Sequence, residues 1–273
     1  QVATNMVMHR MIGSIMSERS ASPLAGRTAL VTGGSRGIGA ACATALAHLG
    51  ANLVLVGRTR ETLEQHAITL RDIGVEATVA VADASDPENL RAALGSFSNV
   101  DSLANNVGGT TSAPLERATM EIWNQTLAIN LTACFVATQA LLPAMKKRSW
   151  GRIVNIASTA GLKGYSYVAP YCAAKHGVVG MTRALAVEMA GSGVTINAVC
   201  PGFTDTDMTR ESVGRIQSAT GLSEDRAYAE LTTMNPQGRL IKPEEVASAV
   251  AWFCLPDAAS TTGQSLAVAG GEI

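Results

Sequence analysis

Aromatic and charged residues are scarce in this chain of 273 residues. Phenylalanine, tryptophan and tyrosine make up only 4% of it, which argues against the base-stacking platforms of proteins that bind single-stranded nucleic acid. The formal net charge is −1, so no basic field favours nucleic acid or an anionic membrane. No uninterrupted apolar run reaches the ~18 residues that a membrane span needs. The sequence therefore predicts neither partner, and its 47% of hydrophobic residues allow a sizeable core.

Cysteines are few and scattered. None lies in a C-x-x-C motif or in a Cys/His cluster with zinc spacing, so we expect reduced thiols, no metal site and a cytoplasmic location. Residues 1–22 are rich in methionine and irregular, without the apolar core and cleavage site of a signal peptide. We expect them to form a disordered or added tail, and residues 23–273 to form the folded domain.

Short apolar runs alternate with helical patterns from Leu24 onward. The expected strands are residues 28–31, 52–56, 76–82, 100–104, 152–157, 194–199 and 263–268. The expected helices are residues 37–49, 60–73, 86–97, 120–147, 169–190 and 243–253. The strands are continuous apolar runs, which indicates a parallel sheet covered on both faces. The predicted fold class is therefore α/β, a single domain with a doubly wound (Rossmann-type) seven-stranded parallel sheet.

One segment interrupts this alternation. Residues 203–240 are polar, carry Met208, Tyr228 and Met234, and follow the strand predicted at 194–199. In open α/β sheets, ligands bind beyond the carboxyl ends of the strands. A long insertion at such a strand end is therefore expected to be a substrate lid.

A glycine-rich turn follows the first strand. Residues 32–39 read TGGSRGIG, with glycines at positions 33, 34, 37 and 39. Gly33 permits a tight turn, Gly37 lets a diphosphate approach the backbone, and Gly39 lets the helix pack close to the strand. The N-terminus of the helix then faces the anion. Between a first strand and a first helix, this turn favours a dinucleotide.

The residues after the second strand bear on which dinucleotide is bound. A carboxylate at this place would bind the ribose hydroxyls of NAD, but the chain has Arg58 and no acid. Arg36, in the glycine turn, can reach the same place. Two guanidinium groups suit a phosphate, so NADP(H) is expected in preference to NAD(H). A surface role for Arg58 with relaxed selectivity is the alternative.

Tyr171 and Lys175 lie one helical turn apart, so they share a helix face, and Ser158 precedes Tyr171 by thirteen residues. An ammonium group beside a phenol favours the phenolate, so we expect Lys175 to lower the pKa of Tyr171 from its ordinary value near ~10. The spacing alone is weak evidence, because a packed tyrosine and a solvated lysine would give the same pattern.

Taken together, these motifs resemble those of the short-chain dehydrogenases/reductases, and the resemblance covers residues 24–272. It is carried by the turn at 32–39 and by Asp83, Asn105, Asn106, Gly108, Asn130, Ser158, Tyr171, Lys175, Pro201 and Gly202. The chain departs from the family at one position, where Val107 replaces the alanine of the N-N-A-G motif. The extra methyl groups are expected to shift the packing beside the cofactor groove slightly.

The resemblance implies a catalytic set. Tyr171 would be the general acid in carbonyl reduction, and Ser158 would hydrogen-bond the carbonyl oxygen. Lys175 would tune Tyr171 and hold the nicotinamide ribose, while Asn130 would hold a water of a proton relay.

The resemblance also implies a set of cofactor-binding residues. These are Gly33, Ser35, Arg36, Gly37, Ile38, Gly39, Arg58, Asp83, Ala84, Asn105, Gly108, Tyr171, Lys175, Pro201, Gly202 and Thr204. Asp83 would contact the adenine amino group, and the last three residues would flank the nicotinamide.

The implied reaction is hydride transfer from NADPH to a ketone. Residues 151–158 and 169–180 look most like ketoreductases of 3-oxoacyl thioesters and polyketide chains. An NAD(P)-dependent alcohol, sugar or polyol dehydrogenase is one alternative, and a catalytically silent NADP(H)-binding protein is another. The cations at 146–148 could meet an acyl carrier protein or the phosphates of CoA, although they would also complement a helix C-terminus. The family resemblance further implies a homotetramer.

Overall fold

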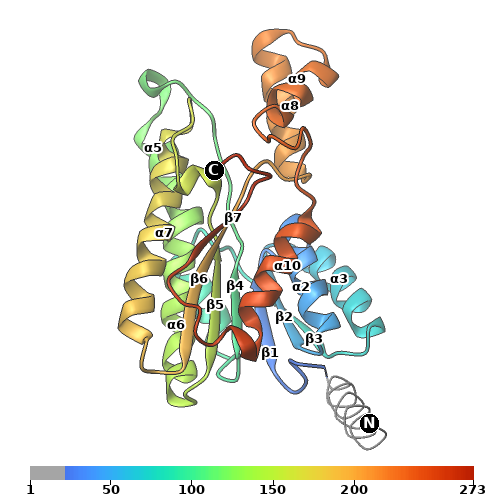
Figure 1. The fold of residues 1–273 in the computed structure, drawn as a ribbon, viewed down its shortest axis with the longest axis vertical. Helices are drawn as coiled ribbons and strands as arrows, with labels where there is room; N and C mark the ends of the chain where they lie inside the picture. Colours follow the sequence, from blue (N-terminus) through green and yellow to red (C-terminus); the bar gives the residue numbers. More distant parts are fainter. Residues whose placement is uncertain (1–21) are drawn as a thin grey trace, which may run out of the picture.

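The computed structural model describes residues 22–273, so the predicted tail lies outside the described residues except for Ser22. A seven-stranded parallel sheet forms the centre of the fold, in the order β3-β2-β1-β4-β5-β6-β7 (Figure 1). Its strands are β1 (Thr28–Thr32), β2 (Asn52–Gly57), β3 (Ala77–Val81), β4 (Ser102–Asn105), β5 (Gly151–Ile156), β6 (Val194–Pro201) and β7 (Ser265–Val268). The winding direction reverses between β1 and β4, which is where open α/β sheets bind ligands.

Helices cover both faces of the sheet, as Figure 1 shows. On one face lie α2 (Gly37–His48), α3 (Arg60–Asp72) and α10 (Pro243–Cys254). On the other lie α4 (Pro87–Leu94), α6 (Ala133–Lys147) and α7 (Ala169–Met189). Every residue of β5 and β6 is buried, because these central strands are covered from both sides. The predicted fold class is confirmed.

The predicted helix over residues 120–147 is divided in three. α5 (Met120–Leu127) and α6 are joined by a π-helical turn at Ala128–Thr132. Within that turn, the Asn130 side-chain amide donates to the Thr126 carbonyl at 2.9 Å, four residues earlier. Such π-helical turns often mark functional sites. A local side-chain bond of this kind is not visible in hydrophobic periodicity, so the sequence predicts an unbroken helix.

The same stretch, Met120–Lys147, is the one helix in the described part of the chain that is long and apolar enough to cross a membrane. Its most apolar window has a mean hydropathy of 1.6. In the fold it packs against α4, α7 and β5, as a core helix does.

The segment predicted as a lid folds into two helices. α8 (Asp207–Thr220) and α9 (Glu224–Thr232) project beyond the sheet at the end where β6 finishes (Figure 1). They enclose a small core of their own, formed by Val213, Ala227 and Leu231. The polar composition of the segment concealed these helices, since only a narrow face of each is buried. Their role as a lid remains a prediction.

Of the three cations at the end of α6, Arg148 has a structural role. Arg148 donates to the carbonyl oxygens of Ser98 and Val100, so it joins the end of α6 to the loop before β4. Lys146 and Lys147 are exposed. A structural role therefore accounts for Arg148, and only the two lysines stay available to a partner.

Candidate active site

Ser158, Tyr171 and Lys175 gather at the carboxyl end of β5. Ser158 follows the strand and caps a short 3₁₀ turn, with its hydroxyl accepting from the Ala160 N–H at 3.1 Å. Pro170 stands in the first turn of α7, where its missing N–H costs no hydrogen bond. Tyr171 and Lys175 lie one turn apart on α7, as predicted, with the ammonium nitrogen 5.6 Å from the centre of the phenol ring.

Lys175 is buried. Its side-chain nitrogen donates to the Ile156 carbonyl at 2.8 Å, which ties α7 to the end of β5. Burial lowers the pKa of Lys175 to about 8, because the interior disfavours the charged ammonium. This residue can therefore change its protonation state at mildly alkaline pH.

The prediction that Lys175 lowers the pKa of Tyr171 below its ordinary value is wrong for the chain without a bound nucleotide. Burial raises the pKa of Tyr171 to about 12, and the hydroxyl of Ser158 lowers it only in part. Desolvation of the phenolate is the largest cause, and Lys175, which is itself buried and bonded to a backbone carbonyl, does not reverse it. The phenol stays protonated at neutral pH, which suits a proton donor.

The lowered pKa of Lys175 predicts a pH-dependent stability. Between about pH 8 and the ordinary value of 10.5, the unfolded chain holds a proton on this lysine that the folded chain has released. Raising the pH then favours the folded state, by up to about 1.4 kcal/mol per pH unit. Urea unfolding of wild type and Lys175→Met should show the wild type gaining free energy of unfolding relative to the variant across this window. A constant difference would contradict the prediction.

Asn130 reaches the same site from the π-helical turn. Its amide nitrogen donates to the Gly109 carbonyl at 2.7 Å, and its oxygen accepts from the Gly109 N–H at 3.2 Å. A β-carbon placed on Gly108 would lie 2.7 Å from this oxygen and 3.4 Å from the Lys175 nitrogen. All four predicted catalytic residues are therefore close together, with Gly108 filling the space between two of them. The water-holding role of Asn130 remains a prediction.

The glycine turn is tight where the sequence requires it to be. Gly33 has φ +67 and Gly37 has φ +53, a region that favours glycine. A β-carbon on Gly39 would lie 2.1 Å from the Gly33 carbonyl oxygen, so α2 packs directly on the turn. The backbone geometry thus fits the cradle that a diphosphate needs at the start of α2.

Two side chains that were not among the predicted site residues hold this turn. The Asn106 amide donates to the Thr32 carbonyl at 3.0 Å and to the Gly33 carbonyl at 3.3 Å. The His66 Nδ1 lies 2.7 Å from the Gly34 carbonyl oxygen, to which it donates, and its Nε2 lies 3.2 Å from the Thr44 hydroxyl. Asn106 was detectable beside Asn105 in the sequence motif, whereas nothing in the sequence relates His66 to a turn 32 residues earlier.

At the adenosine end, Arg58 is exposed and Asp83 lies close enough for the Arg58 charge to help lower its pKa. The largest causes of that lowering are the hydrogen bonds from Ser85 to the Asp83 carboxylate. Arg36 is also exposed, but its guanidinium lies 3.6 Å from the Asp207 carboxylate at the start of α8. The structure therefore couples Arg36 to the predicted lid, an ion pair that spacing in the sequence does not indicate.

Asn105 does not present its side chain to the groove. It is buried, and its amide donates to the Thr138 hydroxyl at 3.1 Å and to the Asn155 oxygen at 2.9 Å. The amide thus joins β4 to β5 and α6, and a contact of Asn105 with the nucleotide remains a prediction. An asparagine at a strand end looks alike in sequence whether it faces a groove or the core.

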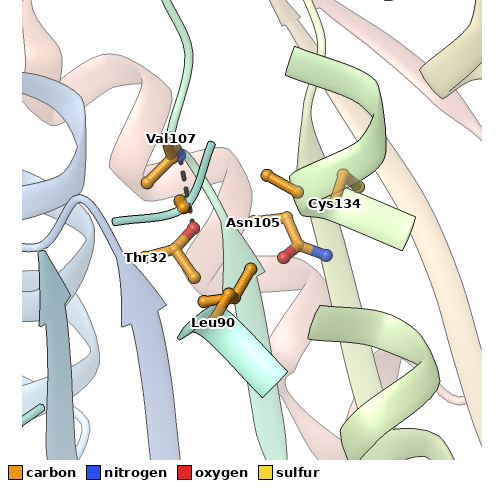
Figure 2. A pocket seen from close by; sticks show the side chains of 7 residues that line it. Thr32, Leu90, Asn105, Val107 and Cys134 are labelled. Carbon is orange, nitrogen blue, oxygen red and sulfur yellow. Dashed lines mark hydrogen bonds between the residues drawn. The ribbon is translucent and has the colours of Figure 1, made fainter. Parts of the chain in front are cut away.

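The Asn105 oxygen has no partner within residues 22–273, and it borders a hollow of about 10 Å³. Figure 2 shows this hollow with Thr32, Leu90, Val107 and Cys134 around it. The Val107 N–H donates to the Thr32 hydroxyl at 3.2 Å, the bond drawn in Figure 2. Val107 therefore lines this hollow, which leaves room for roughly one water.

The remaining predicted cofactor residues lie along the same edge of the sheet. Pro201 ends β6, Gly202 donates to the Val268 carbonyl at 3.0 Å, and the Thr204 hydroxyl donates to the Gly202 carbonyl at 3.0 Å. Ser35 lies in the glycine turn and Ile38 packs against the core. Ala84 is buried and borders the hollow described above. Their contacts with a nucleotide remain predictions.

This architecture, with a glycine turn at the switch point and a Ser-Tyr-Lys cluster beyond β5, defines a dinucleotide-dependent oxidoreductase. The chain belongs to the short-chain dehydrogenase family, whose family model matches residues 27–216. A protein of Streptomyces violaceoruber, assigned as ketoacyl reductase 1 of the granaticin polyketide synthase, is 40% identical over 89% of this chain and 92% of the relative. The 3-oxoacyl-(acyl-carrier-protein) reductase FabG of Vibrio cholerae is 40% identical over 91% of this chain and 98% of the relative.

Solved structures agree with this membership. An actinorhodin polyketide ketoreductase variant with NADPH has a TM-score of 0.86 at 38% identity, covering 90% of this chain and 97% of that one. A protein from Beutenbergia cavernae, assigned as an NAD(P)-dependent gluconate 5-dehydrogenase with bound NADP, has a TM-score of 0.85 at 38% identity, covering 93% and 99%. The predicted family is confirmed.

Proposed function

We propose that this protein is an NADPH-dependent ketoreductase that reduces a 3-oxoacyl thioester or a related ketone. The observation that carries the proposal is the convergence of Ser158, Tyr171 and Lys175 at the strand end next to the glycine turn. The similarity to ketoacyl reductases over nearly the full chain supports the same substrate class. NADPH, when bound, supplies the hydride.

The chain's own residues supply the proton and the positioning. Ser158 lies beside Tyr171 and holds the carbonyl oxygen between the two hydroxyls. Tyr171, whose pKa burial raises to about 12, keeps its proton at neutral pH and gives it to that oxygen as negative charge develops. Lys175, whose nitrogen lies 5.6 Å from the centre of the Tyr171 ring, and Asn130 are the candidates to return a proton to the phenol after each turnover.

The glycine turn would hold the diphosphate, and Arg58 beside Asp83 would meet the adenosine phosphate. Pro201, Gly202 and Thr204 would flank the nicotinamide. The cramped backbone at Gly39 and the exposed arginine beyond β2 are the features that fit this group. The pairing of Arg36 with Asp207 makes Arg58 the more available phosphate ligand of the two.

Arg58→Ala is expected to raise KM for NADPH about tenfold, the effect of one charge-assisted hydrogen bond. KM for NADH should change little, since NADH lacks the 2′-phosphate. Arg60→Ala is the matched control, because that nearby exposed arginine lies 3.9 Å from Glu64. Steady-state kinetics with both nucleotides measure the effect, and a wild-type preference for NADH would contradict the cofactor assignment.

A panel of carbonyl compounds tests the reaction itself. NADPH absorbance would be followed with an acetoacetyl thioester, a diketone and a keto sugar. The proposal expects the highest kcat/KM with the thioester. A preference for the sugar would favour a sugar dehydrogenase, the alternative that the likeness to the gluconate dehydrogenase structure supports. Binding of NADPH with no oxidation by any carbonyl would favour a silent binding protein.

We further propose a homotetramer, in the cytoplasm, where the five free thiols stay reduced. Apolar side chains are exposed on two faces. Met120, Trp123, Phe135 and Val187 lie on the α5–α7 side, and Trp252 and Leu266 lie on α10 and β7. Lys146 and Lys147 would contact an acidic carrier protein.

The oligomer can be tested through its exposed apolar residues. Phe135→Glu and Val187→Glu are expected to reduce the mass below that of a tetramer, because a buried unpaired carboxylate destabilises an interface. Ile68→Glu on α3 is the control, since this residue is about as exposed as Phe135 and lies on the other side of the sheet. Light scattering after gel filtration gives the mass. A monomeric wild type would contradict the proposal.

A further inference from the structure

The carboxylate of Glu272 is buried beside the active site, and the proposed mechanism does not use it. Gly270 and Gly271, with φ +61 and φ +93, turn the chain back after β7 and bring Glu272 onto the carboxyl edge of the sheet. Its side chain is only 2% exposed. Burying a carboxylate costs free energy that an apolar residue at this place would not incur.

Two side chains from the Ser158 loop bind one oxygen of this carboxylate. The Lys163 nitrogen lies 2.9 Å from Oε1, and the Tyr165 hydroxyl donates to the same atom. The Thr159 hydroxyl lies 2.6 Å from the Tyr165 hydroxyl and donates to it. A continuous hydrogen-bond chain therefore runs from Glu272 to the residue next to Ser158.

The other oxygen faces the opposite wall of the site. Oε2 has no hydrogen-bond partner within the described residues, and a β-carbon on Gly202 would lie 3.0 Å from it. The Tyr165 ring meets the Phe203 ring edge-on, with centroids 6.3 Å apart. Glu272 is thus packed between the loop that carries Ser158 and the segment that begins the predicted lid.

We propose that Glu272 is a positioning residue for carbonyl reduction. Through Lys163 and Tyr165, its carboxylate fixes the loop that carries Ser158 relative to Gly202 and Phe203. The separation of these two segments sets where the carbonyl lies against the nicotinamide and how wide the substrate entrance is. The inference rests on the ketoreductase function proposed above and deepens it, because it names the residue that sets the geometry of the substrate side.

The test uses Glu272→Gln, which keeps the shape and removes the charge. Because the contact is charge-assisted, we expect kcat to fall about five- to tenfold. KM for NADPH should stay within about twofold and the Tm within a few degrees, because the glycine turn is not touched. Glu188→Gln, an exposed glutamate on α7, is the matched control and should leave kcat unchanged.

A double-mutant cycle distinguishes the loss of one shared contact between Glu272 and Tyr165 from a general loosening of the loop that carries Ser158. Tyr165→Phe removes the hydroxyl and keeps the ring. If both residues act through one contact, the double variant should lose no more kcat than the more affected single variant. We also expect Glu272→Gln to lose more kcat with a bulky ketone than with a small one, because the proposal has Glu272 set the width of the substrate entrance.

Three outcomes would overturn the inference. Glu272→Gln could keep wild-type kcat with every ketone, its kcat loss could be simply additive with that of Tyr165→Phe, or KM for NADPH could rise in parallel with the loss of kcat. If the wild type fails to oxidise NADPH with every carbonyl compound of the panel, the proposed function is overturned as well. The wild-type panel therefore distinguishes failure of the function from failure of the Glu272 inference.

Discussion

Tyr171→Phe is expected to lower kcat for carbonyl reduction by about 10²- to 10⁴-fold, the range of general acid catalysis. The substitution removes one hydroxyl and keeps the ring that packs at the start of α7. This phenol is protonated at neutral pH, so the wild type has a proton donor and the variant has none. The proton would then have to come from a water without the same alignment to the carbonyl oxygen.

The affinity for NADPH should be unchanged in this variant, because the glycine turn and Arg58 are intact. Tyr167→Phe is the matched control, since this exposed tyrosine lies just before α7 and its backbone carbonyl, not its hydroxyl, makes the contact with Ala113. Single-turnover measurements at saturating NADPH would isolate the chemical step. A Tyr171→Phe kcat within threefold of wild type would show that another group donates the proton.

Gly39→Ala is expected to weaken NADPH binding by about 100-fold, the loss of one or two charge-assisted hydrogen bonds to the diphosphate. The added methyl would lie 2.1 Å from the Gly33 carbonyl oxygen and 2.5 Å from the Asn106 amide nitrogen. The first of these is backbone in the turn itself, so α2 must move away from β1. The cradle of N–H groups at the start of the helix then loses its alignment.

Fluorescence titration with NADPH measures the affinity, and thermal unfolding should show a lower Tm because the same shift opens the core under α2. Gly95→Ala is the control. This glycine ends α4 with φ −58, and its added β-carbon would make only ordinary contacts of 3.5 and 3.7 Å. An NADPH affinity of Gly39→Ala within threefold of wild type would refute the assigned role of the turn.

Local rules account for the elements that the sequence predicts correctly. Short, largely apolar runs rich in β-branched residues are typical of strands covered on both faces, so β5 and β6 were predictable from the sequence pattern. Asp86, the first residue of the helix predicted over residues 86–97, caps α4, and its carboxylate accepts from the backbone N–H groups of Glu88 and Asn89. Tyr171 and Lys175 share a helix face because four residues make about one turn.

Features that depend on distant contacts were not predictable in this way. Asn130 in the π-helical turn bonds locally to Thr126 and also to the Gly109 backbone, which lies on a loop 21 residues away. The direction of the Tyr171 pKa depends on how much protein surrounds the phenol, and one neighbouring lysine does not determine it. The predicted lid is helical because α8 and α9 bury their narrow apolar faces against each other.

The sequence by itself determined the chemical groups and their order. It placed a glycine turn after the first strand, an arginine after the second, and Ser158, Tyr171 and Lys175 around the fifth. Each of these depends on neighbours within a few residues, where spacing and backbone geometry are enough. Only the tertiary structure decided which way Asn105 faces, that Arg36 meets Asp207, and that Glu272 meets Tyr165 across 107 positions. Such contacts form when separate elements pack, and no local pattern encodes them.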